Sequence, residues 1–122
     1  MNRGSHLALG AAGENAAVQA LERDGYVILA RGYRTRAGEL DIVARDGSCL
    51  VFVEVKTRAD LRCGHPAEAV TPRKQRKLAA MAQDYLARHD VREGTCRFDV
   101  VAVLLGDSGV QVEIIRDAFH VA

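Results

Sequence analysis

Ionisable side chains inside strand-like sequence are the feature that most constrains the fold of this chain. Residues 38–58 read GELDIVARDGSCLVFVEVKTR, two apolar runs separated by Arg45-Asp46-Gly47-Ser48. Runs rich in β-branched residues on either side of an Asp-Gly turn predict a β-hairpin. Four ionisable side chains interrupt the runs: Glu39, Asp41, Glu54 and Lys56. The hairpin must therefore carry charge on strands that are otherwise suited to a core.

Strand side chains alternate between the two faces of a sheet, and this alternation gathers three of the charged groups. A turn at Asp46-Gly47 places Asp41 diagonal to Glu54, and a turn at Gly47-Ser48 places the two directly opposite each other. Either register puts Lys56 on the same face. The other face is apolar and is expected to pack on the core; it carries Leu40, Ile42, Val51, Val53 and Val55.

Two carboxylates at this spacing repel each other, which raises the pKa of one of them unless a cation lies between. Mg²⁺ reverses that penalty, because it binds one or two carboxylates together with waters and phosphate oxygens. Lys56, two residues beyond Glu54, can orient an attacking water or stabilise charge on a phosphate. It can equally well neutralise the acids on a solvated face, and the spacing alone leaves both interpretations open.

The whole sequence predicts one α/β domain over residues 1–122, with residues 1–7 disordered or derived from a tag. Periodicity and turn signals place a helix at 8–24, strands at 26–33, 39–44 and 49–57, a helix at 72–89 and strands at 98–105 and 110–116. Thr71 followed by Pro72 is typical of a helix N-cap and first position. Asp99, which follows Arg97, is expected to form a structural ion pair.

Positive charge is concentrated around the hairpin, although the net charge of the chain is only +1. Cations are unfavourable at a helix N-terminus, yet four of them fill the first turns of the second predicted helix. Such a cluster can bind phosphate, and a solvated charged face explains it about as well. Three further arginines flank the hairpin strands. The candidate nucleic-acid-binding residues are Arg34, Arg36, Arg58, Arg73, Lys74, Arg76 and Lys77. Because aromatic residues are few, recognition of phosphate and shape is expected rather than base readout.

Several classes of protein are disfavoured by the sequence. No apolar run approaches the length of a membrane span, and the N-terminus lacks a hydrophobic signal core, so a cytoplasmic protein without membrane contact is expected. The three cysteines form no CxxC motif and the four histidines form no pair at ligand spacing, which argues against zinc sites and a disulfide framework.

Five ordered segments resemble a known family. Asp41 followed by Glu54-Val55-Lys56 resembles the D…(D/E)xK motif of restriction-endonuclease-like nucleases. GAAGE at 10–14, GELDIVA at 38–44, FVEVKTR at 52–58, the basic helix after Pro72 and RFDVV at 97–101 together resemble the small bacterial YraN-type family over nearly the whole chain. One departure is Gly32, which stands where an asparagine is expected. The resemblance implies a restriction-endonuclease-like mixed β-sheet flanked by helices, in the order α-β-β-β-α-β-β, similar to archaeal Holliday-junction resolvases.

The resemblance also implies a function. It is that of a metal-dependent endonuclease that hydrolyses phosphodiester bonds in DNA, with branched or repair intermediates as substrates and Mg²⁺ or Mn²⁺ as cofactor. Asp41 and Glu54 would hold the metal, and Lys56 would position the nucleophile. Glu14, whose position near a helix start is otherwise explained by the helix dipole, would be a further ligand. A homodimer is a further expectation. The alternative is a non-catalytic nucleic-acid-binding or complex-forming protein on a nuclease-like scaffold.

Overall fold

The computed structural model of the chain describes residues 3–59 and 70–121, with side chains from residue 10 onward. The order of elements is helix, three strands, helix, two strands, as the sequence predicts. The bounds are α1 (Arg3–Arg23), β1 (Val27–Thr35), β2 (Gly38–Asp46), β3 (Cys49–Arg58), α2 (Pro72–Arg88), β4 (Cys96–Gly106) and β5 (Gly109–Phe119). The helix α1 begins before the predicted start at residue 8, because no proline in residues 3–9 stops it. β1 and β5 run past their predicted ends.

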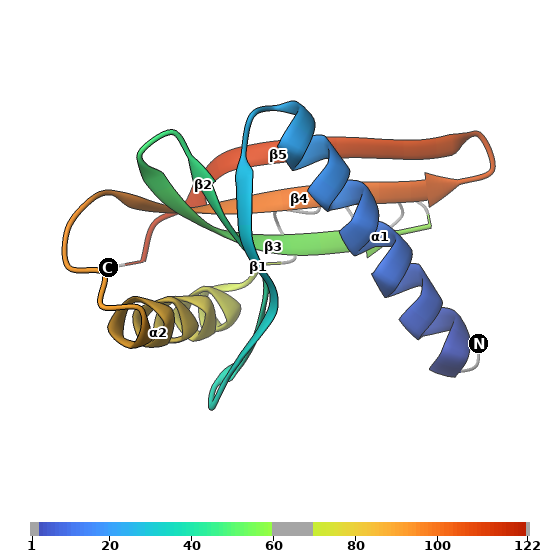
Figure 1. Cartoon of the computed structure of the whole chain (residues 1–122). Coiled ribbons are helices and arrows are strands. Elements are labelled where there is room, and N and C mark those ends of the chain that lie inside the picture. Colours follow the sequence, from blue (N-terminus) through green and yellow to red (C-terminus); the bar gives the residue numbers. More distant parts are fainter. Residues whose placement is uncertain (1–2, 60–69, 122) are drawn as a thin grey trace.

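The five strands form one mixed sheet in the order β1-β2-β3-β4-β5 (Figure 1). Neighbouring strands are antiparallel except β3 and β4, which are parallel. A parallel pair needs a long crossover, and α2 lies in the connection between these two strands. The result is the α/β architecture with a helix on each face of the sheet.

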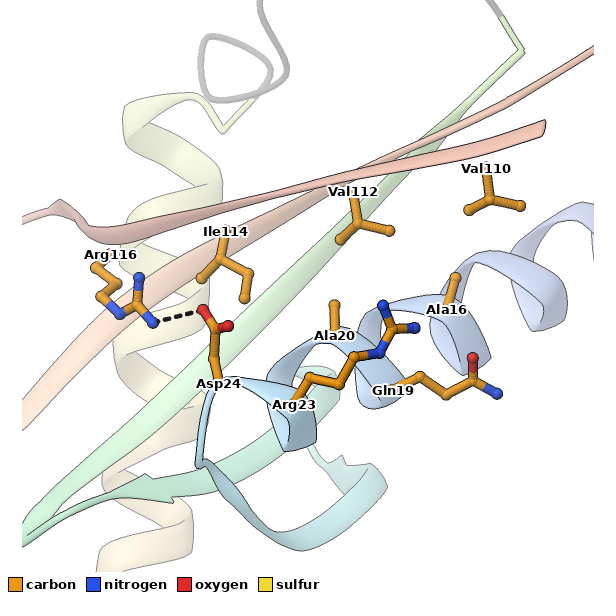
Figure 2. A pocket seen from close by; sticks show the side chains of 9 residues that line it. All are labelled: Ala16, Gln19, Ala20, Arg23, Asp24, Val110, Val112, Ile114 and Arg116. Atoms are coloured by element: carbon orange, nitrogen blue, oxygen red, sulfur yellow. Dashed lines mark hydrogen bonds and ion pairs between the residues drawn. The ribbon is translucent and has the colours of Figure 1, made fainter. Parts of the chain in front are cut away.

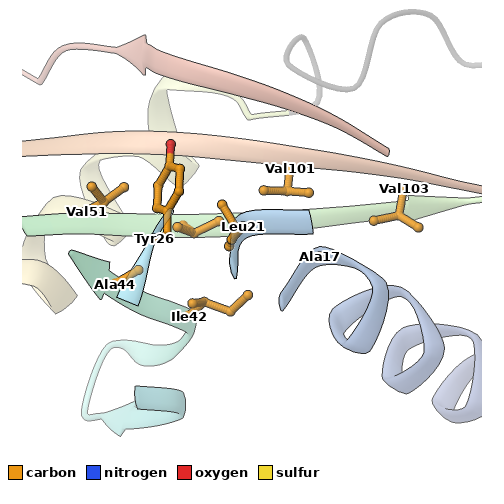
Figure 3. Packing of buried hydrophobic residues seen from close by; sticks show 9 residues of the cluster. Ala17, Leu21, Tyr26, Ile42, Ala44, Val51, Val101 and Val103 are labelled. Carbon is orange, nitrogen blue, oxygen red and sulfur yellow. The ribbon is translucent and has the colours of Figure 1, made fainter. Parts of the chain in front are cut away.

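One core lies between α1 and the sheet, and Figure 3 shows it. Ala17 and Leu21 of α1 pack against alternate residues of the central strands, including Ile42, Val53 and Val101. The other core lies on the opposite face, where Leu78, Met81 and Tyr85 of α2 pack with Phe52 and Val100. Neighbours in sequence, such as Phe52 and Val53, thus bury their side chains in different cores, which accounts for the almost continuous apolar runs in β3 and β4.

The β2–β3 hairpin adopts the second of the two registers that the sequence allowed. Ile42 pairs with Val53, and Asp46 pairs with Cys49. Gly47 in the intervening turn has a φ of 60°, a left-handed conformation that favours glycine. This register directs Asp41 toward Glu54.

Leu40 corrects one prediction, because it lies in the core beneath α2 rather than beside Ile42 in the core beneath α1. The pairing of β2 with β3 ends at Ile42, whereas β2 continues to pair with β1 as far as Gly38. Gly32, on β1 between the partners of Ile42 and Leu40, has a φ of 60°. The β1–β2 hairpin therefore curves away from β3 (Figure 1), and the strict alternation of β2 is lost at this bend.

Candidate functional site

Asp41 lies where β2 separates from β3. Its Oδ2 atom accepts a 2.8 Å hydrogen bond from the backbone N–H of Val55. The last backbone partners of the β2–β3 ladder before this point are Ile42 and Val53. The carboxylate therefore occupies a place that a strand carbonyl would take if the ladder continued, and this contact fixes its orientation.

Glu54 is the second acid and is almost fully buried, with 6% of its surface exposed. Its Oε2 atom has no hydrogen-bond partner among the described residues. Burial, a hydrogen bond with Glu54 and repulsion from the Glu54 charge together raise the pKa of Asp41 to about 8, and the Val55 N–H opposes this rise. The Asp41 carboxyl is thus held close to a second acid in a space that water does not reach freely, which favours its protonated form.

Two lysines are candidates to interact with this carboxylate pair, and only one of them forms an ion pair with it. Lys56 is half-buried on β3, and no ion pair joins it to a residue that the structure describes. Lys74 of α2 extends to the pair instead, with Nζ 3.3 Å from Glu54 Oε2. That oxygen accepts no hydrogen bond. The Lys74 ammonium therefore forms an ion pair with Glu54 but is not aligned to donate a hydrogen bond to it.

Glu14 is held at the margin of the site. Its Oε1 atom lies 3.1 Å from Nε of Arg31, and Arg31 also donates a 2.7 Å hydrogen bond to Asn15. Repulsion from Glu14 is the smallest of the contributions that raise the pKa of Asp41. Gly13 lets α1 approach this end of β3, because a Cβ there would overlap the Thr57 side chain.

The described residues, 3–59 and 70–121, contain no group of three His, Cys, Asp or Glu side chains arranged to hold a metal ion. Asp41 and Glu54 meet as predicted, while Glu14 stays with Arg31. Two carboxylates are nevertheless enough for Mg²⁺, which completes its coordination with waters and phosphate oxygens. The Oε2 atom of Glu54, which accepts no hydrogen bond, and the raised pKa of Asp41 both fit a divalent cation, which would relieve the repulsion between the two acids.

The basic residues of α2 divide into two groups. Lys74 is half-buried and turns toward Glu54, whereas Lys77 is exposed although its side chain passes Gly38, where an added Cβ would lie 3.0 Å from Cε of Lys77. Arg73 and Arg76 are exposed. The contact of Lys74 with Glu54 was not predicted from the sequence. The one indication in the sequence is that a cation is unfavourable at a helix N-terminus and so needs another reason to be there.

The arginines outside α2 do not form one continuous patch. Arg34, on β1, is exposed and lies 3.5 Å from Glu39. Arg36, in the turn after β1, lines a small pocket with Asp84 and Arg88 of α2. Arg58 is half-buried at the end of β3. Contact of these three arginines with DNA stays a prediction.

The predicted ion pair of Arg97 with Asp99 is confirmed and belongs to a separate network. Asp99 is fully buried; Arg97 donates to both of its oxygens, at 2.9 and 3.0 Å. The hydroxyl of Tyr26 donates a 2.7 Å hydrogen bond to Asp99 Oδ2, and the N–H of Asp117 donates to Oδ1 at 3.0 Å. With its oxygens satisfied, Asp99 joins α1's end, β4 and β5 and has a structural role.

A cavity of about 490 Å³ lies apart from the carboxylate pair, between α1 and β5 (Figure 2). Val110, Val112 and Ile114 form one wall, and Arg116 and Asp24 close one end with a 2.9 Å ion pair. None of its lining residues is a site residue predicted from the sequence.

No helix in the described part of the chain is long and apolar enough to cross a membrane.

Fold and site together define a small α/β protein with a mixed five-stranded sheet and a carboxylate pair, one acid buried and one half-buried, where two strands separate. Residues 13–103 match the model of the family described as "Uncharacterised protein family UPF0102". A UPF0102 protein of Symbiobacterium thermophilum is 52% identical over 113 residues, which cover 92% of this chain and 96% of the relative. One from Chlorobaculum parvum is 48% identical over 120 residues, 93% of each chain. The chain belongs to the UPF0102 family, as the resemblance to YraN-type proteins indicated.

Proposed function

We propose that this protein is a metal-dependent endonuclease of the restriction-endonuclease-like superfamily that hydrolyses phosphodiester bonds in DNA. The observation that supports this best is the pair formed by half-buried Asp41 and buried Glu54 where β2 and β3 separate. Two neighbouring acids that are largely removed from water are unfavourable for folding unless they bind a ligand. A hard cation bound to a phosphodiester is the ligand that their oxygen atoms and charge favour.

Each residue of the site has a distinct role in this proposal. Asp41, oriented by the Val55 N–H, and Glu54 would hold one or two Mg²⁺ or Mn²⁺ ions, with Glu14 a further ligand if it leaves Arg31. The bound metal supplies a Lewis acid that activates water and neutralises charge on the phosphate. Lys56, on the same face of β3 as Glu54, would orient the attacking water and stabilise developing negative charge.

Branched or repair intermediates are the proposed substrates, and a homodimer is the proposed assembly, by similarity to archaeal Holliday-junction resolvases. The exposed Arg73 and Arg76 on α2 and the arginines of the β1–β2 hairpin, which curves away from the sheet, support contact with a wide backbone. Such contacts recognise phosphate and shape.

One observation favours a second candidate, a non-catalytic nucleic-acid-binding or complex-forming protein. Lys74 already neutralises Glu54 at 3.3 Å, as it would in a degenerate site that no longer binds metal. The two candidates differ in metal binding, because only the nuclease requires a divalent cation at Asp41.

Calorimetric titration with Mn²⁺ separates the two candidates. The nuclease proposal expects binding in the wild type and its loss in Asp41→Ala. Glu39→Ala is the matched control, because Glu39 is an exposed acid on the same strand that pairs with Arg34; its Mn²⁺ binding should equal that of the wild type. Absence of Asp41-dependent binding would favour the non-catalytic candidate.

A further inference from the structure

The backbone of Lys74 is fixed in position by the start of α2. Thr71 caps the helix, and its Oγ1 accepts a 3.2 Å hydrogen bond from the Lys74 backbone N–H. The side chain of Gln75 donates a 3.0 Å hydrogen bond to the Val70 carbonyl, and Val70 is buried in the core beneath α2. These contacts hold the first turn of α2 against the sheet, so the Lys74 side chain starts from a defined point beside Glu54.

The position of Lys74 does not serve the stability of the helix. A cation in the first turn opposes the positive end of the helix dipole. Glu54 offsets that effect only in part, because its Oε2 atom is buried and still lacks a hydrogen bond although Lys74 Nζ lies 3.3 Å away. Lys74 therefore supplies positive charge beside a buried carboxylate oxygen that accepts no hydrogen bond.

The Lys74 side chain is also able to leave. It is 35% exposed, whereas the Glu54 side chain is 7% exposed. A divalent cation binds a carboxylate oxygen at about 2.1 Å, so it and an ammonium cannot both stay at Glu54 Oε2 without strong repulsion. The more exposed lysine is therefore the partner that has space in solvent into which it can move.

We propose that Lys74 is an internal counter-ion of the carboxylate pair, which a divalent cation displaces and which then binds a phosphate of the nucleic acid. The proposal rests on the proposed metal-dependent function. It assigns Lys74 a conditional role: its ammonium stabilises the acids without metal and contributes to DNA binding only when metal is bound. Metal and DNA should then increase each other's affinity through Lys74, since such coupling is reciprocal.

The first measurement is Mn²⁺ affinity by calorimetry. Lys74→Met removes the competing charge and keeps much of the chain's length. It should bind Mn²⁺ about tenfold more tightly than the wild type. That factor corresponds to the repulsion expected in water between a divalent cation and an ammonium about 5 Å apart. Lys74→Arg keeps the charge and should bind Mn²⁺ as the wild type does. Arg76→Met, on the same helix and exposed, should leave the Mn²⁺ affinity unchanged.

The second measurement is DNA affinity with EDTA and with Ca²⁺, a hard cation that also uses oxygen ligands. Lys74→Met should bind DNA like the wild type in EDTA and more weakly than the wild type in Ca²⁺. Arg76→Met should weaken binding equally under both conditions, because its exposed side chain has no metal-dependent partner.

The outcomes separate this inference from the proposed function. If the wild type shows no Asp41-dependent Mn²⁺ binding, the proposed function fails, and the Lys74 inference fails with it. If the wild type binds Mn²⁺ through Asp41 but Lys74→Met binds it no more tightly, only the Lys74 inference is overturned. A lower melting temperature of Lys74→Met with unchanged Mn²⁺ affinity would make Lys74 a structural tie between α2 and β3. Lys74→Gln repeats the test should the methionine variant fail to fold.

Discussion

Oδ2 of Asp41 accepts a 2.8 Å hydrogen bond from the backbone N–H of Val55, just beyond the last backbone pair between β2 and β3. The Asp41 side chain thus accepts the hydrogen bond of a β3 backbone N–H at the point where the backbone pairing of β2 and β3 ends. This relationship links fold to site, because the same separation of strands that orients Asp41 also brings it beside Glu54. The charged residues that interrupt the hairpin in sequence mark the place where the sheet divides.

Asp41→Asn should flatten the dependence of stability on pH when no divalent cation is present. The pKa of Asp41 in the folded protein is raised from 3.8 to about 8, so the folded state binds the proton more tightly than the unfolded state. Stability should therefore fall as pH rises between these two values. Asparagine cannot ionise, so the variant should melt above the wild type at about pH 8, with the difference closing below about pH 5.

Melting curves in EDTA across this pH range test that prediction. Mn²⁺ should raise the wild-type melting temperature at about pH 8 and leave Asp41→Asn unchanged, since a ligand stabilises the state that binds it. Equal slopes of melting temperature against pH in the two proteins would contradict a raised pKa of Asp41 in the folded protein.

Asp99→Ala should destabilise the fold without affecting metal binding. Removing one partner of a buried pair leaves the other uncompensated and costs about 3–5 kcal/mol; here Arg97, Tyr26 and the Asp117 N–H all lose an acceptor. The pKa of Tyr26, raised to about 12 by burial and by Asp99, should fall. Asp24→Ala is the control, because its pair with Arg116 is exposed and should be worth less than about 1 kcal/mol. Urea unfolding compares the two, and similar losses would refute a structural core at Asp99.

Gly13→Ala and Gly10→Ala should change stability in opposite directions. Both lie in α1, where alanine is favoured over glycine by about 1 kcal/mol. A Cβ at Gly10 meets nothing within 4 Å, whereas one at Gly13 overlaps the Thr57 side chain. Gly10→Ala should therefore stabilise the protein, and Gly13→Ala should destabilise it by about 1–3 kcal/mol through overpacking. Adding Thr57→Ala should recover much of that loss in urea unfolding; no recovery would mean that α1 packs differently on β3.

Alanine substitution of Arg73, Lys74, Arg76 and Lys77 should weaken DNA binding and reduce its dependence on salt. Each phosphate contact releases counterions, so each lost contact should make the slope of log affinity against log salt shallower by about one. Fluorescence anisotropy at several salt concentrations in Ca²⁺ measures this slope. A variant with the wild-type slope and affinity would exclude α2 from the DNA interface.

The sequence predicted the order of elements and the meeting of Asp41 with Glu54, because turn signals and strand alternation are local properties. It could not predict the position of Leu40, since β2 leaves β3 while still bound to β1, and that bend depends on pairing between segments. Lys74 was predicted as a phosphate-binding residue, yet its partner is Glu54, twenty positions earlier on the sheet. That contact depends on how α2 crosses back over the sheet, which no spacing in the sequence encodes.

The most direct test of the proposed nuclease is a cleavage assay on branched, flapped, single-stranded and duplex DNA with Mg²⁺ or Mn²⁺. The wild type should cut at least one of these substrates. Glu54→Ala, purified in the same way to control for contaminating nuclease, should lose about a hundredfold or more of the rate, since the metal supplies several kcal/mol of transition-state stabilisation, while still binding DNA. Cleavage of none of the substrates by the wild type, or equal cleavage by Glu54→Ala, would contradict the proposed function.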